Sequence, residues 1–202
     1  MPPIPPITKA LMLICTAMFC LDALLRSFIG PVLPLWFALW PLGTEHFMPW
    51  QPFTFVFVHT DVLGLFFNML ALWMFGAELE RLWGYRRYVQ FLLAATVTAA
   101  ICYLLLSLAV SAFAPAMGSA PMLYATLLAS AMLFPDRTIM PLFPPIPMKQ
   151  RTFVMVFGAI VLFSGLGTRT VAPFAYLGGM AGAWLIIRYW RGQAPFPPKR
   201  RR

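Results

Sequence analysis

Few side chains in this sequence are of types that carry out covalent chemistry. Its only histidines are His46 and His59, and its three cysteines are Cys15, Cys20 and Cys102. The cysteines lie in apolar runs without paired spacing, so they predict neither a disulfide framework nor a zinc site. A serine can carry out hydrolysis only with a base that takes its hydroxyl proton and with hydrogen-bond donors that stabilise the oxyanion. We expect no metal and no cofactor.

The composition restricts where any such chemistry takes place. The chain has 202 residues, of which 61% are apolar and only 10% are Asp, Glu, Lys or Arg. An ordinary soluble domain carries roughly 25% charged residues. A soluble enzyme, a nucleic-acid-binding domain and a disordered tail are excluded, because each needs charge that this chain lacks. The sequence therefore predicts an all-α polytopic membrane protein.

Apolar runs that approach the ~20 residues needed to cross a bilayer occur at six places. Helix breakers and charged residues mark their ends, as where Gly84 precedes Arg86 and Arg87. No leader-like cleavage site follows the first run, which we therefore interpret as a retained helix. The predicted helices are Thr8–Leu25, Val62–Phe75, Tyr88–Val110, Met122–Phe134, Phe153–Leu166 and Phe174–Tyr189.

The distribution of basic residues predicts an orientation. If the amino terminus is cytoplasmic, thirteen of the fifteen Lys and Arg residues fall on the cytoplasmic side. Short basic segments resist translocation, so both termini are predicted to be cytoplasmic, in a bacterial inner (plasma) membrane. Residues 192–202 form a basic tail, for which we expect contact with anionic lipid headgroups and no binding of nucleic acid. The net charge of +9 is thereby explained by topology.

The stretch between the first two predicted helices, residues 30–59, is rich in both aromatic residues and prolines. Aromatic rings at this density favour the headgroup level of a bilayer, and the prolines prevent one continuous helix. We therefore expect a structured insert that lies partly in the outer leaflet. It is either an interfacial connector or a lip that faces a substrate.

Several segments resemble the rhomboid family of intramembrane serine proteases. They read WQPFTFVFVH over residues 50–59, FFNMLALWMFGAELERLWG over 66–84, LFPDR over 133–137 and FAYLGG over 174–179. Together the matching positions extend from about Trp50 to Trp190, in the family's order and spacing. The resemblance implies a single membrane domain over residues 1–202, with a core at about 8–191. It also implies a six-transmembrane-helix bundle with a water-accessible cavity.

The resemblance also locates the family's catalytic positions, and both are substituted. Members carry a nucleophilic Ser in a Gly-x-Ser-Gly motif at the start of the fourth helix, where this chain has Ala120 followed by Pro121. A His on the sixth helix serves as base, and its place is taken by Tyr176, with Pro173 at a further substituted position. The intact catalytic set is therefore absent, which indicates a natural loss of catalysis.

The family's oxyanion donors are an Asn and a His four residues apart on the second helix. Asn68 matches the Asn, but Gly64 stands where the His belongs. His59 matches another family His, which the resemblance associates with the shape of the insert. We interpret Asn68 as a buried amide that bridges helices.

Two alternative catalytic sets use residues that are present. Ser119 and His59 form a dyad only if both their separation and the oxyanion geometry are rebuilt, and Ser119 better fits an N-cap before Pro121. Tyr176 is a poor base because a phenol has a pKa of ~10.

Small residues on the sixth predicted helix predict a close helix contact. Gly178 and Gly182 are four residues apart, and alanines on the fourth predicted helix offer a complementary surface. Tyr124, at the family's aromatic position one turn past the nucleophile, is then expected to face Tyr176.

These observations favour a pseudoprotease that binds transmembrane helices of client membrane proteins within the lipid bilayer. The candidate substrate-binding residues are Phe57, Trp73, Tyr124 and Phe174. An active rhomboid serine endopeptidase with non-standard residues is the first alternative, and a scaffold subunit of a membrane assembly is the second. The sequence does not indicate an oligomeric state or a particular client.

Overall fold

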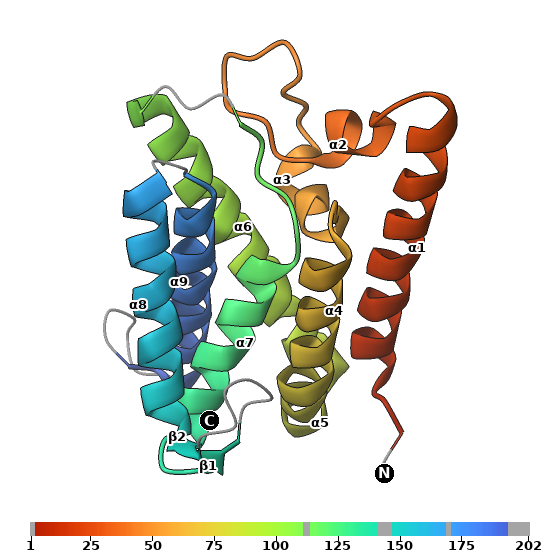
Figure 1. Cartoon of the computed structure of the whole chain (residues 1–202). Coiled ribbons are helices and arrows are strands. Elements are labelled where there is room, and N and C mark those ends of the chain that lie inside the picture. The colour runs from red at the N-terminus through yellow and green to blue at the C-terminus, as the bar shows by residue number, and fades with distance from the viewer. Residues whose placement is uncertain (1–2, 111–113, 141–146, 169–170, 194–202) are drawn as a thin grey trace.

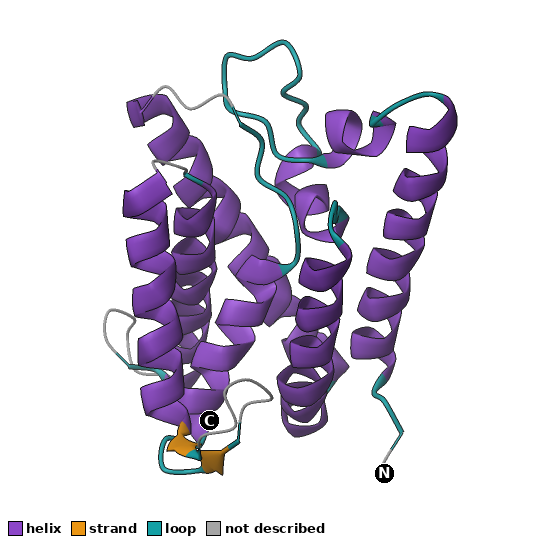
Figure 2. Ribbon diagram, in the orientation of Figure 1, coloured by secondary structure: helices purple, strands orange, loops and turns teal. Residues whose placement is uncertain are grey.

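The computed structural model describes residues 3–110, 114–140, 147–168 and 171–193, and the basic tail predicted at 192–202 lies almost wholly outside them. Six long helical segments run roughly alongside one another, and the short helices of the insert lie at one end (Figure 1). Figure 2 shows that helices account for most of the described chain and that the two short strands in the described part pair with each other.

The elements follow the chain in a simple order. They are α1 (Pro6–Phe28), α2 (Val32–Phe37), α3 (Gln51–Thr54), η1 (Phe55–Phe57), α4 (Val62–Ala71), the π-helical η2 (Leu72–Gly76), α5 (Ala77–Trp83), α6 (Tyr85–Val110), α7 (Ala120–Leu133), β1 (Thr138–Ile139), β2 (Met148–Lys149), α8 (Gln150–Thr168) and α9 (Ala172–Arg191). Each of the six predicted apolar runs coincides with one long helical segment.

Three helical segments among the described residues are long and apolar enough to cross a membrane. They are Pro6–Phe28, Val62–Trp83 and Tyr85–Ala109, and shorter apolar helices occupy Ala120–Leu133 and Gln150–Phe163. The prediction of a polytopic helical membrane protein is confirmed at this level.

The second helical segment extends past its predicted end at Phe75 to Trp83. The predicted end is where the apolar run stops, and the charged residues Glu78, Glu80 and Arg81 lie in the added turns. Glu80 is nevertheless only 3% exposed, because its carboxylate serves another helix. Gly84, with φ of +77°, ends the segment in a conformation that favours glycine.

Glu80 caps the start of α1. Its carboxylate accepts hydrogen bonds from the backbone N–H of Ile7 at 2.9 Å, from that of Thr8 at 2.7 Å and from the Thr8 hydroxyl at 2.8 Å. The first N–H groups of a helix have no partner within the helix and carry partial positive charge. The buried Glu80 carboxylate accepts hydrogen bonds from these N–H groups, and its negative charge complements their partial positive charge. The contact also fixes α5 against α1.

The small residues of α9 pack mainly against α6, which corrects the predicted pairing of Gly178 and Gly182 with the alanines of α7. A Cβ on Gly178 would lie 2.6 Å from the Cβ of Cys102, and one on Gly182 would collide with Thr98, both of which are on α6. Only Gly179 meets α7, where a Cβ would lie 2.5 Å from the carbonyl oxygen of Pro121. A pattern of small residues predicts close approach but does not identify the neighbouring helix.

The insert is structured, as predicted. The buried Gln51 side chain accepts from the Trp40 backbone N–H at 3.1 Å and donates to the His46 carbonyl at 2.7 Å. Leu39 forms a two-way backbone bridge with Ala116, with both N···O distances at 2.9 Å. The insert is therefore attached directly to the segment that leads into α7.

Candidate functional site

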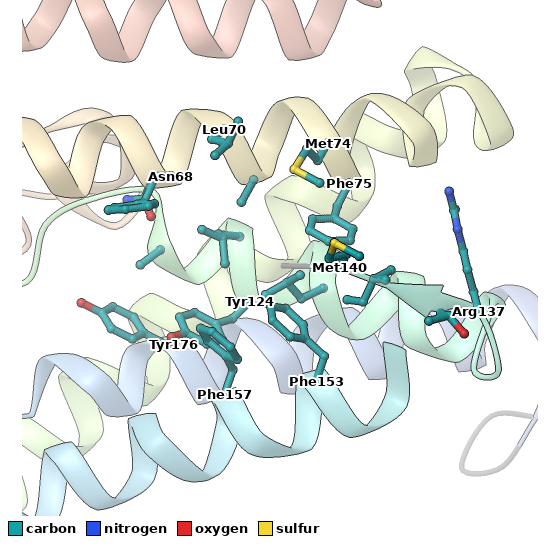
Figure 3. Close-up of a pocket in the computed structure, with 17 residues that line it drawn as sticks. Asn68, Leu70, Met74, Phe75, Tyr124, Arg137, Met140, Phe153, Phe157 and Tyr176 are labelled. Atoms are coloured by element: carbon teal, nitrogen blue, oxygen red, sulfur yellow. The ribbon is translucent and has the colours of Figure 1, made fainter. Parts of the chain in front are cut away.

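A cavity of about 640 Å³ is lined by residues of α4 and η2, of α7 and of α8, with Tyr176 of α9. Figure 3 shows Asn68 and Tyr176 at one end and Arg137 at the other, with Met74, Tyr124 and Phe157 between them. The lining residues are Phe67, Asn68, Leu70, Ala71, Met74, Phe75, Ala120, Leu123, Tyr124, Leu127, Arg137, Thr138, Ile139, Met140, Phe153, Phe157 and Tyr176. The site is thus predominantly apolar.

The two positions that the resemblance assigns to the nucleophile and the base meet at this cavity. Ala120 begins α7, Tyr176 lies in the first turns of α9, and both line the same end together with Asn68. The rings of Tyr124 and Tyr176 are stacked, with centroids 5.5 Å apart and planes 5° from parallel, as the sequence indicated. The end of the cavity where the resemblance places a nucleophile and a base therefore holds a methyl group and a pair of phenol rings.

The remaining family substitutions have local structural reasons. Asp61 is the N-cap of α4 and accepts the Gly64 N–H at 2.5 Å, and a Cβ on Gly64 would lie 2.6 Å from the same carboxylate. A side chain at position 64 must therefore displace the cap. Pro121 and Pro173 occupy the first turns of α7 and α9, where proline is tolerated because those N–H groups have no intrahelical partner.

His59 accepts hydrogen bonds from two directions through Nε2. The Ser119 backbone N–H and the Asn68 side-chain amide both lie 3.3 Å from this atom, and both can only donate. The ring proton therefore resides on Nδ1, which lies 3.3 Å from the Phe57 carbonyl and donates to it. Burial lowers the pKa of His59 below its ordinary value, and the nearby Asp61 charge opposes this effect.

The structure also brings Ser119 to His59, at 3.1 Å between Oγ and Nε2. This pair is the alternative dyad weighed from the sequence, but the sequence does not give the distance, because the two residues are 60 positions apart. Ser119 occupies the N-cap position of α7 but makes no side-chain cap bond, contrary to its predicted role. The two residues are only 1% and 4% exposed, and neither lines the cavity.

Of the four candidate substrate-binding residues, only Tyr124 lines the cavity. Phe57 packs against the core, and Trp73 is 36% exposed on η2. Phe174 lines a second groove between α6 and α9, where its carbonyl accepts from Cys102 Sγ at 3.4 Å. Among the described residues, no group of three His, Cys, Asp or Glu side chains is placed to hold a metal ion.

Comparison with known protein families identifies the family of this chain. Residues 9–200 match the family model described as "Eukaryotic integral membrane protein (DUF1751)". The chain belongs to this family. It is also similar to the rhomboid protease GlpG from two strains of Klebsiella pneumoniae, at 36% identity over 77 residues in each case. Each match covers 38% of this chain and 26% of the protease, so the chain spans about a quarter of the length of these relatives.

The family member is thus a rhomboid-like integral membrane protein, as the resemblance implied. The predicted bacterial inner membrane is wrong, because the matching family is one of eukaryotic integral membrane proteins. The source of the error is physical. An excess of basic residues on one side orients a chain across a membrane, but the same rule operates in many membranes and does not identify which one.

Proposed function

We propose that this protein is a rhomboid-like pseudoprotease, a six-span bundle that binds transmembrane segments of client proteins without cleaving them. The convergence of Ala120, Tyr176 and Asn68 at one end of an apolar cavity carries the proposal. The position that would hold the attacking hydroxyl holds a methyl group. A phenol, which ionises near a pKa of ~10, is poorly suited to remove a proton from an alcohol.

The shape of the cavity supports lateral binding. Phe67, Met74 and Met140 line it yet are 49%, 46% and 64% exposed, so the cavity opens onto the side of the bundle. In a bilayer this side faces lipid and other membrane proteins. A client helix that lies along the opening can insert side chains between α4 and α8, where they meet Tyr124 and Phe157.

A second candidate is serine hydrolysis by Ser119, because Ser119 Oγ lies 3.1 Å from an unprotonated imidazole nitrogen. Two features oppose it. The same nitrogen accepts from the Ser119 N–H and from Asn68, and the burial of both residues denies a peptide bond access to the hydroxyl. Hydrolysis therefore requires that the segment before α7 separate from the insert.

One experiment tests client binding directly. The protein is reconstituted in phosphatidylcholine vesicles with a synthetic single-span peptide, and a photo-crosslinking amino acid replaces Met74 or, as a control, Ile101 in the α6–α9 groove. We expect crosslinks from position 74, none above background from position 101, and intact peptide throughout. Equal crosslinking from both positions would reject lateral binding at this cavity.

A second measurement separates the two candidate functions. A fluorophosphonate probe labels an activated serine at any position, so we expect no labelling of this protein beside an active rhomboid control. Labelling that is lost in Ser119→Ala, together with peptide cleavage, would establish the hydrolase instead.

A further inference from the structure

The cavity is elongated. Along α4 and η2 its lining extends from Asn68 to Phe75, which is a rise of about 10 Å, and Arg137 marks its far end. Its volume of about 640 Å³ leaves room for an extended chain along this length.

The walls suit a hydrocarbon chain. Leu70, Met74, Leu123, Leu127 and Phe157 present apolar atoms along its middle. Half-exposed apolar side chains at the opening let a chain enter from the side. The volume also lies in the range of ~300–1,000 Å³ that is typical of small-molecule sites.

The far end of the cavity is charged. Arg137 bonds Glu78 at 2.5 Å through one of its nitrogens, and a guanidinium carries five N–H donors, so donors remain for another anion. Thr138 also lines this end and pairs with Lys149 across the β1–β2 hairpin. The exposed Arg151 follows at the start of α8, and its backbone N–H bonds the Pro135 carbonyl. Lys149 forms an ion pair with Asp136 at 3.4 Å, so Arg151 is the basic residue in excess of the two carboxylates, Glu78 and Asp136, at this end.

We propose that the cavity holds one acyl chain of an anionic phospholipid, with its phosphate beside Arg137 and Thr138. The chain runs from Arg137 toward the stacked rings of Tyr124 and Tyr176. The elongated shape and the apolar walls match a hydrocarbon chain, and the polar far end matches a phosphate at the level where the helices end. This inference goes beyond client binding, since the lipid occupies the cavity when no client is present and a bound client displaces it.

Photoreactive lipids test the proposal directly. The full chain is reconstituted with phosphatidylglycerol or phosphatidylcholine that carries a diazirine midway along one acyl chain, and the adducts are mapped by mass spectrometry. We expect phosphatidylglycerol adducts concentrated on Met74 and Phe157, and several-fold fewer with phosphatidylcholine. Adducts confined to Ile101 and Leu105 in the α6–α9 groove, or spread evenly over the exposed faces, would overturn the proposal.

Matched variants test the two ends of the site. Ala71→Phe fills the cavity and should abolish the adducts at Phe157, whereas Ala181→Phe in the α6–α9 groove should leave them unchanged. Arg137→Gln should reduce the preference for phosphatidylglycerol about fivefold, the effect of removing one basic residue near a headgroup. Arg86→Gln, which replaces an exposed arginine at the start of α6, should leave the preference for phosphatidylglycerol unchanged.

These variants also keep the proposal falsifiable. Loss of the headgroup preference in Arg86→Gln but not in Arg137→Gln would overturn the assignment of the phosphate, even if Ala71→Phe fails to fold. In a second experiment, the lipid adducts of the wild-type protein are measured after a single-span peptide is added. If the peptide leaves every lipid adduct in place while it crosslinks to position 74, the lipid does not occupy the cavity.

Discussion

Ser119 Oγ and His59 Nε2 lie 3.1 Å apart, at a junction where the segment before α7 meets the insert. Gly118, with φ of +99°, donates its N–H to the Phe55 carbonyl at 2.9 Å in the same junction. An alcohol and an imidazole are thus in hydrogen-bond contact, but inside a backbone connection. Because His59 Nε2 accepts from the Ser119 backbone N–H and from the Asn68 side-chain amide, we interpret the contact as a structural hydrogen bond.

The neutral state of His59 predicts a pH dependence of stability. Burial lowers the pKa of His59 in the folded protein, so between that value and the ordinary ~6.5 the unfolded chain binds more protons. The stabilising contribution of His59 is therefore complete above pH ~6.5 and declines as the pH falls toward the folded-state pKa. We expect the melting temperature in detergent to decrease between pH 7.5 and 5, and less so in His59→Gln.

The matched control for this prediction is His46→Gln. His46 is exposed, so its substitution should leave the pH dependence as in the wild type. An unchanged slope in His59→Gln would show that other groups cause the dependence.

Substitution of Glu80 is expected to destabilise the protein more than substitution of the exposed Glu45. Glu80→Ala leaves the N–H groups of Ile7 and Thr8 without their acceptor, and hydrogen bonds to charged groups contribute ~1.5–3 kcal/mol each. We expect a loss of roughly 3 kcal/mol or more in the free energy of unfolding, measured by denaturation in mixed micelles. Glu45→Gln, on an exposed residue of the insert, should have little effect. Equal effects of the two substitutions would contradict the capping role.

The close approach of α9 to α6 predicts a sharp difference between two glycines. Gly182→Ala places a methyl group against Thr98 and the Ala94 carbonyl, and overpacking of this kind costs ~1–3 kcal/mol. Gly158→Ala on α8 meets only the Met180 Cε at 3.7 Å, an ordinary contact, and should be neutral or stabilising. Thermal unfolding of both variants checks the prediction, which fails if Gly158→Ala is the more damaging.

Restoring the lost groups should restore reactivity in part. Ala120→Ser and Tyr176→His place a hydroxyl and an imidazole at the same end of the cavity, since both positions line it. We expect fluorophosphonate labelling of the double variant in a Ser119→Ala background, and none of the Ala120→Ser single variant. Adding Gly64→His should lower stability, because the new side chain must displace the Asp61 cap.

A double variant that folds yet resists labelling would indicate that the two side chains do not approach one another. That outcome would weaken the assignment of Ala120 and Tyr176 as the former catalytic pair. Labelling of the wild type would instead favour the hydrolase.

The long helices were predictable from the sequence because hydropathy reports directly on helices that bury apolar surface. The end of the second helical segment was not, because the apolar run stops at Phe75 while the helix continues through turns in which Glu80 bonds the start of α1. The stacking of Tyr124 on Tyr176 followed from the family resemblance. The 3.1 Å contact of Ser119 with His59 did not, because a distance across 60 residues depends on how the insert folds back.

The bond between Glu80 and the start of α1 has a consequence for biosynthesis. The carboxylate that completes the first helical turn is synthesised 72 residues after Thr8, so during translation that turn emerges without its acceptor. The start of α1 therefore completes its hydrogen bonds only after the second helical segment has been synthesised. The contact between α1 and α5 forms when the second helical segment brings Glu80 to Thr8.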